Sequence, residues 1–197
     1  VNDKGCSALS IAILQEYHVI ALYLIWNGRL DPKDKSKIDE IFAGFEEKDT
    51  QLKFQDGRRI SKEKRIVDLN CTSNDGWNPL LLAASNKAKT VFLNILDASK
   101  DGKINVNGTI NKSLTTALHL CSCNNRDDIM LMKLLAYKPD LQAVTKTSKW
   151  TALHLAAKYN SYHSIRALVN AGADVIAKSS KGSLPIDILR KHNAHTS

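Results

Sequence analysis

A four-residue pattern recurs along this 197-residue chain at a nearly constant spacing. Residues 116–119 and 151–154 both read Thr-Ala-Leu-His, and related tetrads begin at residues 7, 78 and 184. The successive intervals are 71, 38, 35 and 33 residues; the last three lie near one 33-residue period and the first near two. Such a period is typical of chains in which one small structural unit is stacked on the next. We therefore expect a repetitive fold.

Each tetrad has the features of a helix start. Thr116 and Thr151 can cap a helix through their hydroxyl groups, and Pro79 and Pro185 suit the first helical position. Small residues follow the tetrads, and apolar residues then recur at helical spacing. One such unit cannot bury both of its faces, so neighbouring units must stack to form a continuous core.

The fourth copy has the fullest set of these features, because its second apolar stretch ends in Gly172-Ala173-Asp174-Val175. The turn, the helix start, the second helix and this ending together resemble the ankyrin-repeat family over residues 2–31 and 67–193. The resemblance implies an all-α solenoid of stacked helix-turn-helix repeats with short β-hairpin fingers. We predict a single ankyrin-repeat domain over 1–197, with repeats at about 2–31, 67–110 with an extended finger, 111–143 and 144–177, and a capping repeat at 178–193. The cap is expected to have a second helix truncated to about 188–192, with Asp187 in the position of the tetrad histidine.

Some copies depart from the family pattern. Leu114 and Lys149 stand where the turn glycine is expected, which predicts altered turns in those two copies. Asn125 and Asn160 replace the glycine between the helices at little cost, because asparagine tolerates a left-handed backbone. Pro139 interrupts the closing turn of the third copy.

Two segments are longer than the period allows. Residues 32–66 form either a degenerate repeat, which we favour, or an insertion; Ile38, Ile41, Phe42 and Phe45 share one face of a possible helix there. In the second segment, residues 104–110 alternate apolar and polar side chains around Asn107-Gly108. Asn-Gly is a strong hairpin signal, so we expect a lengthened finger with its turn at that dipeptide.

Composition restricts the functional classes. No apolar stretch is long enough to span a membrane, and the N-terminal residues do not form a secretory signal. Four cysteines are too few for a disulfide scaffold, which favours a reducing, cytoplasmic or nuclear location. The absence of an initiator Met suggests a fragment cut from a longer protein, and we expect it to be a monomeric domain of that protein. With 28 basic and 20 acidic residues the net charge is +8, which favours acidic partners.

The sequence does not indicate an enzyme. It lacks phosphate-binding glycine motifs and a nucleophile-elbow motif, and Cys121 and Cys123 have neither the spacing nor the additional ligands of a zinc site. Cys121 occupies a small-residue position of the first helix, and the regular recurrence of His119 and His154 favours structural hydrogen bonding over catalysis. We therefore predict no catalytic, metal or cofactor site.

The resemblance implies that the fingers and the first helices line a concave face that binds a protein partner. Two of the three tryptophans, Trp77 and Trp150, immediately precede a tetrad on this face, either as binding anchors or as covers for the neighbouring hairpin. The predicted partner-binding residues are Asn74, Asp75, Trp77, Lys112, Thr115, Lys146, Ser148, Lys149, Trp150, Lys158, Tyr159, Lys178 and Lys181.

The lysines of the later copies predict an acidic protein partner for this adaptor or scaffold module. Two alternatives stay open. The chain could be the targeting or substrate-recruiting segment of a larger enzyme or secreted microbial effector. It could also bind nucleic acid, which is less expected, through the run of five basic residues from Arg58 to Arg65 and through the basic fingers.

Overall fold

The structure, a computed structural model, describes residues 8–16, 21–22, 24–25, 68–98, 104–123 and 128–194. The segment 32–66, with its expected helix and its basic run, lies outside the described residues, as does Asn125. Within the described ranges, no helix is long and apolar enough to cross a membrane.

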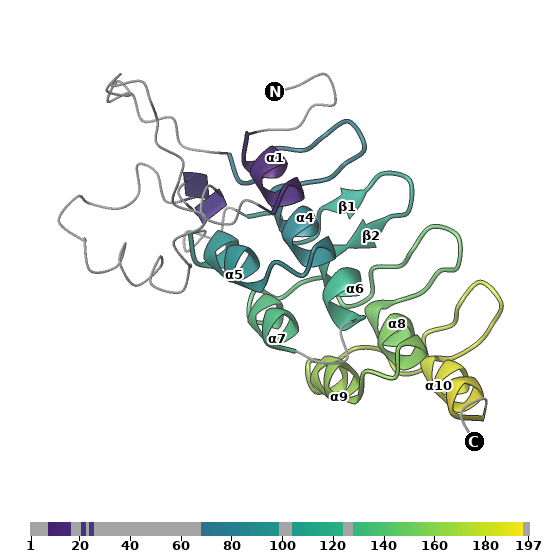
Figure 1. Cartoon of the computed structure of the whole chain (residues 1–197). Coiled ribbons are helices and arrows are strands. Elements are labelled where there is room, and N and C mark those ends of the chain that lie inside the picture. The colour runs from purple at the N-terminus through teal and green to yellow at the C-terminus, as the bar shows by residue number, and fades with distance from the viewer. Residues whose placement is uncertain are drawn as a thin grey trace, which may run out of the picture.

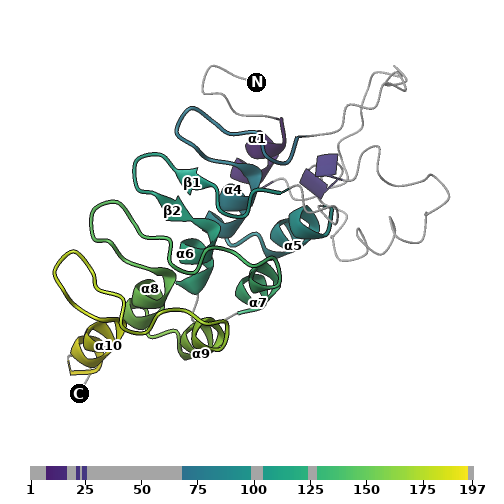
Figure 2. The same ribbon diagram turned by 180° about the vertical axis from the view of Figure 1, so that it is seen from behind.

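The helices form two parallel rows that run the length of the molecule (Figures 1 and 2). The inner row consists of α1 (Ala8–Leu14), α4 (Pro79–Ser85), α6 (Ala117–Ser122), α8 (Ala152–Lys158) and α10 (Pro185–Ala194). The outer row consists of α5 (Lys89–Ala98), α7 (Ile129–Leu135) and α9 (Tyr162–Asn170). Each inner helix packs against the next, α5 packs against α7, and α7 packs against α9. The predicted all-α stack of helix pairs is confirmed.

The predicted helix starts are also confirmed. Asn78 caps α4 by accepting a hydrogen bond of 2.7 Å from the Leu81 N–H, and Pro79 occupies the first turn of the helix. Thr116 forms a capping box with His119 at the start of α6. Thr151 and His154 form the equivalent pair at the start of α8.

The core runs between the two rows without interruption. The inner helices contribute small side chains such as Ala84, Cys121 and Ala156, which allow the helices to pack closely. The outer helices contribute larger ones, and Phe92 and Leu131 are fully buried. Burial of each such large side chain stabilises the fold by roughly 1.5–3 kcal/mol.

The extended finger of the second repeat differs from its predicted form. Strand β1 (Thr109–Ile110) pairs antiparallel with β2 (Thr115–Thr116), so the hairpin turn lies at residues 111–114 and the expected turn at Asn107-Gly108 is wrong. The alternation at 104–110 has another cause, because Ile104 and Val106 are buried in the core. Asn107 bridges to the next repeat by accepting a 2.8 Å hydrogen bond from the Asp140 N–H through Oδ1.

Single backbone hydrogen bonds join successive fingers. The Asn111 N–H donates to Asp75 O at 2.9 Å, and the Lys146 N–H donates to Ser113 O at 2.8 Å. The Ser180 N–H donates to Ser148 O at 2.9 Å. The fingers therefore lie side by side along one edge of the stack (Figure 1).

The finger turns differ between the copies. The Gly76 and Gly182 N–H groups donate to the carbonyl three residues earlier, whereas the Leu114 and Lys149 N–H groups donate to the carbonyl four residues earlier. Gly76 and Gly182 have φ of 85° and 75°, while Leu114 and Lys149, which occupy the same position, have φ of 54° and 52°. The prediction of altered turns is therefore confirmed, because the turns at Leu114 and Lys149 are one residue longer than the glycine turns. Leu114 and Lys149 nevertheless adopt the left-handed backbone that favours glycine. Asn160 also has a positive φ, 53°, as predicted for its position between the helices.

The C-terminal end of the stack is not built as expected. Residues 185–194 form one continuous inner helix, so the prediction of a truncated second helix at 188–192 is wrong. An apolar groove of about 150 Å³ is left between α8, α9 and α10. Ile186 in this groove is 44% exposed, whereas Leu153, the equivalent residue of the preceding repeat, is 4% exposed.

Candidate protein-interaction face

The thirteen predicted partner-binding residues all lie in the described ranges, on the fingers or on the inner helices next to them. The structure brings only some of them together. Their contacts divide the face into an N-terminal part around Trp77 and a C-terminal part around Trp150.

Trp150, two residues before α8, forms a stripe with His154 and Lys158 of α8, with successive members four residues apart. The Trp150 and His154 rings stack with centroids 6.4 Å apart and planes at 10°. Lys158 Nζ lies 5.2 Å from the centroid of the Trp150 ring and 5.5 Å from that of Tyr159, within cation–π range. We refer to Trp150, His154, Lys158 and Tyr159 as the Trp150 stripe. Trp150, Lys158 and Tyr159 were predicted as site residues, whereas His154 was not.

Trp77 has different surroundings. Its side chain is half-buried and packs against the hydrophobic core. Its backbone closes the finger turn, because Trp77 O accepts from the Ser73 N–H at 2.8 Å. These contacts are with its own finger and with the core, and the role of Trp77 as a binding anchor stays a prediction.

The other N-terminal site residues hold one finger to the next. Lys112 Nζ forms an ion pair with Asp75 at 3.4 Å, and Asn111 Nδ2 donates to Asn74 O at 3.1 Å. Thr115 lies in β2, where its hydroxyl donates to Ser113 Oγ at 2.7 Å. Because the Asp75 carboxylate offsets the Lys112 ammonium, this part of the face carries little unbalanced charge.

The C-terminal part has a cavity of about 310 Å³ beside the Trp150 stripe. It lies between the last two fingers and α10, and it is lined by Ser148, Trp150, Ser179, Ser180, Lys181, Ser183, Ile188 and Lys191. Ser148, Trp150 and Lys181 were predicted as site residues, whereas the sequence did not single out Lys191, Ser179 or Ser180. Ser183 was not among the predicted site residues, but the period places it at the position of Trp150 one repeat later. Lys146, Lys149 and Lys178 are exposed on the same fingers outside this lining.

His119 and His154 each connect two repeats. The Thr116 N–H donates to His119 Nδ1 at 3.2 Å, so Nδ1 carries no proton, and the protonated Nε2 donates to Trp150 O at 3.0 Å. His154 repeats this arrangement with the Thr151 N–H at 3.2 Å and Ser183 O at 3.2 Å. Both side chains are buried, and burial lowers the pKa of each below its ordinary value because it disfavours the charged ring. The predicted structural role of the two histidines is confirmed.

The cysteines of α6 are structural as well. Cys121 is buried, and desolvation raises its pKa to about 12. Desolvation likewise raises the pKa of Cys123 to about 11, and its Sγ contacts His119 O at 3.2 Å. Both thiols are therefore protonated at neutral pH and are poor nucleophiles. No cluster of three or more potential metal ligands occurs among the described residues.

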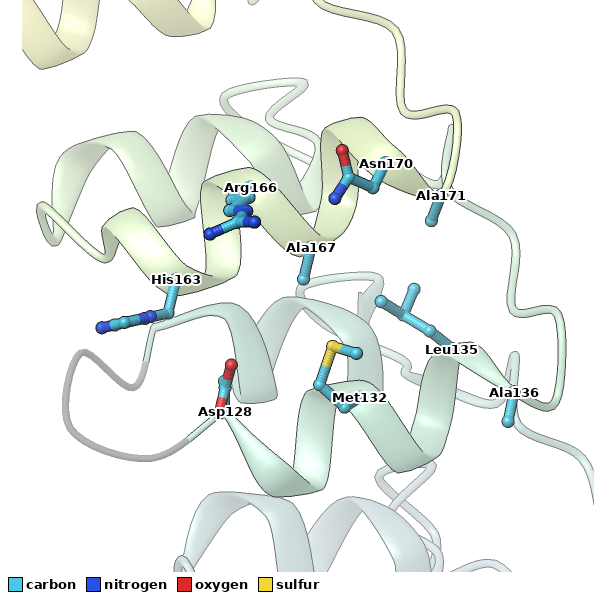
Figure 3. A pocket seen from close by; sticks show the side chains of 9 residues that line it. All are labelled: Asp128, Met132, Leu135, Ala136, His163, Arg166, Ala167, Asn170 and Ala171. Atoms are coloured by element: carbon cyan, nitrogen blue, oxygen red, sulfur yellow. The ribbon is translucent and has the colours of Figure 1, made fainter.

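A second cavity, of about 570 Å³, lies on the outer-helix side between α7 and α9 (Figure 3). Asp128 and Met132 line it from α7, and His163, Arg166 and Asn170 line it from α9. None of the predicted partner-binding residues lines this cavity. It therefore provides a control surface on the opposite side of the molecule from the fingers.

A comparison with protein families matches residues 103–179 to a model of ankyrin repeats in three copies. No curated protein matches the chain. The matched segment contains the hairpin finger, α6 to α9 and the bridge from His119 to Trp150. Ankyrin repeats are generally protein-interaction modules without catalytic activity of their own. The two rows of helices, the stacked fingers and the family match together identify residues 103–179 as ankyrin repeats.

Proposed function

We propose that this chain binds an acidic segment of a protein partner on its fingers and inner helices, with Trp150 as the apolar anchor. The observation that carries the proposal is the Trp150 stripe beside a cavity with two lysines in its lining. Trp150 gives a rigid apolar contact, and aromatic residues of this kind are enriched among the residues that dominate binding energy.

The charge of the surrounding chain supports an acidic partner. Residues 141–186 contain six Lys or Arg residues and one Asp, a net charge of +5. Four of the cations, Lys146, Lys149, Lys178 and Lys181, lie on the last two fingers. Their combined field would accelerate encounter with an acidic segment and make binding sensitive to salt.

Capture from a cell lysate tests the proposal with matched variants. The intact chain is compared with Trp150→Ala, with Lys149→Glu/Lys178→Glu, and with the control Met132→Ala on the opposite side. We expect one set of acidic proteins to be retained by the intact chain and by the control but not by the other two variants. All four proteins are first shown to melt alike. Equal retention by all four would exclude this face as the binding site.

The nucleic-acid alternative is tested separately by fluorescence polarisation with random duplex DNA at two salt concentrations. Neutralisation of phosphates predicts affinity that falls steeply with salt. We expect no binding at low salt. Tight, salt-sensitive binding that survives Trp150→Ala would assign the basic charge to nucleic acid instead.

A further inference from the structure

The cavity between the last two fingers has fixed walls. The Ser180 N–H donates to Ser148 O at 2.9 Å and joins the two fingers. The second finger is closed by the Ser179 N–H to Ser183 O at 3.0 Å and by the Ser183 N–H to Ser179 Oγ at 3.1 Å. His154 Nε2 donates to the same Ser183 O at 3.2 Å and ties the finger to α8. The backbone of the two fingers is therefore positioned before any ligand arrives, which lowers the entropic cost of binding.

The lining is cationic and rich in hydroxyl groups. It contains four serines and the lysines Lys181 and Lys191, and it contains no carboxylate. Lys181 comes from the finger turn and Lys191 from α10, so two elements bring two like charges to one cavity. The carboxylate nearest in sequence, Asp187, uses Oδ2 to accept the Leu184 N–H at 2.9 Å and so caps its own helix.

The charge distinguishes between possible anions. A carboxylate carries one negative charge and leaves one of the two ammonium groups without a counterion. A phosphate monoester carries about −1.5 to −2 at neutral pH and offers three acceptor oxygens, which can bind two lysines and a serine hydroxyl together. Trp150 and Ile188 supply an apolar wall for the residue next to the phosphate.

We propose that this cavity is a subsite for a phosphorylated serine or threonine in the partner's segment, held between Lys181 and Lys191 with its neighbour against Trp150. This inference rests on the proposed function, because it specifies the acidic group that the same face accepts. It makes binding of the partner dependent on phosphorylation.

The test uses the ¹⁵N-labelled 197-residue chain and the blocked dipeptide N-acetyl-phosphoseryl-leucine amide. Amide and indole signals are followed by NMR as the dipeptide is added. We expect saturable shifts centred on Ser148, Trp150, Lys181 and Lys191. The same dipeptide with serine or glutamate in place of phosphoserine should bind at least about tenfold more weakly, because it loses charge-assisted hydrogen bonds.

Three charge variants locate the site. Lys181→Gln and Lys191→Gln should each weaken binding about tenfold, whereas Arg190→Gln, a matched loss of one positive charge on α10 outside the lining, should leave it within about twofold. Equal losses in all three variants would mean general attraction to the basic surface and would overturn the subsite. Inorganic phosphate that binds as tightly as the phosphodipeptide would show a free-phosphate site and would also overturn it.

Failure of the subsite is distinguishable from failure of the proposed function. If glutamate and phosphoserine dipeptides bind equally while Trp150→Ala still loses the captured partner, the phosphate inference is wrong and the acidic-partner function stands. If capture is unaffected by Trp150→Ala, the proposed function is wrong, whatever the dipeptide result.

Discussion

The repeat that contains α4 differs from the two repeats that follow it in the residue at its finger turn and in the residue at its fourth tetrad position. The α4 repeat has Gly76 in its finger turn and Leu81 at the fourth tetrad position. The repeats of α6 and α8 have Leu114 and Lys149 in the turn and His119 and His154 at the fourth position. The α4 repeat therefore has a turn without steric strain and an apolar contact at the fourth tetrad position. The α6 and α8 repeats have strained turns and a hydrogen bond from the histidine to the next repeat.

The difference teaches how register is fixed between repeats. Leu81 has no polar atom and can pack in several related positions, but His119 Nε2 must meet Trp150 O to be satisfied. Because that carbonyl belongs to Trp150, two residues before α8, the bond also fixes the backbone that carries the half-buried Trp150 side chain. The histidine bridge therefore couples stability to the geometry of the proposed binding face.

The largest effect is expected from His119→Ala. The change removes buried volume and leaves the Thr116 N–H and Trp150 O without their partner, so the free energy of unfolding should fall by about 3–4 kcal/mol. Urea denaturation followed by circular dichroism measures the loss.

A second variant, His119→Leu, gives the α6 repeat the residue type that the α4 repeat has at this position, Leu81. It separates the effect of the hydrogen bonds from the effect of the buried volume. It preserves much of the volume, so the loss should be only about 1–3 kcal/mol, the cost of the unsatisfied polar groups. Unchanged stability in His119→Leu would show that the hydrogen bond contributes nothing beyond packing.

The two turn glycines should respond unequally to alanine. A Cβ on Gly76 would lie 2.6 Å from Thr109 O and 2.6 Å from Asn111 Oδ1, whereas a Cβ on Gly182 would meet nothing within 4 Å. Both positions have positive φ, which costs an alanine about 1 kcal/mol. We therefore expect Gly76→Ala to destabilise by about 2–3 kcal/mol and Gly182→Ala by about 1 kcal/mol. Equal denaturation midpoints for the two variants would contradict the close contact at Gly76.

Acidic pH should lower the stability of the α6 and α8 repeats, which contain His119 and His154, more than that of the α4 repeat. The unfolded chain binds protons on these rings near the ordinary pKa of 6.5, and burial lowers the folded pKa of both. Their contribution is therefore complete above pH 6.5 and is lost as the pH falls below it, by at most about 1.4 kcal/mol per pH unit for each ring.

Hydrogen exchange at pH 7 and pH 5.5 measures this loss repeat by repeat. After correction for intrinsic exchange rates, protection should fall more in α6 and α8 than in α4. The double variant His119→Leu/His154→Leu is the control, and it should lose most of the pH dependence. A uniform fall in protection in all three helices would assign the effect to other groups.

The features that the sequence predicted well are local and repeated. The Thr116 and Thr151 caps, the small side chain of Cys121 and the recurring histidines all follow from a few neighbouring residues and the period. Each of these was visible because the same physical requirement produced the same residue type in more than one copy.

The features that it missed depend on residues far apart in the chain. Asn107 looked like part of a hairpin turn, but its side chain accepts from Asp140 N, 33 residues away. The cavity beside Trp150 combines two fingers with Lys191 of α10, and neither segment alone has a binding motif. Leu114 and Lys149 are held at positive φ by hydrogen bonds within and between the fingers, which local propensity does not include.

The smallest expected effect concerns those two strained turns. Lys149 donates its N–H to Thr145 O at 3.1 Å, and the Lys146 N–H of the same finger donates to Ser113 O, so the neighbouring bonds keep Lys149 in the left-handed region. Lys149→Gly removes the steric cost of about 1–2 kcal/mol but increases the entropy of the unfolded chain, which leaves a net stabilisation of about 0.5–1 kcal/mol. Leu114→Gly should behave alike, and the effects should add because the two turns belong to different repeats.

Denaturation midpoints of the single and double variants test this, with Lys146→Gly as the control in the same finger. The control removes a lysine where no positive φ is recorded, so it should not stabilise. Stabilisation by Lys149→Gly but not by Lys146→Gly would show that the turn in the later repeats is imposed by finger stacking against local preference. Destabilisation in both would mean that the lysine side chains themselves support the fingers, and the contrast between the strained and relaxed turns would lose its energetic basis.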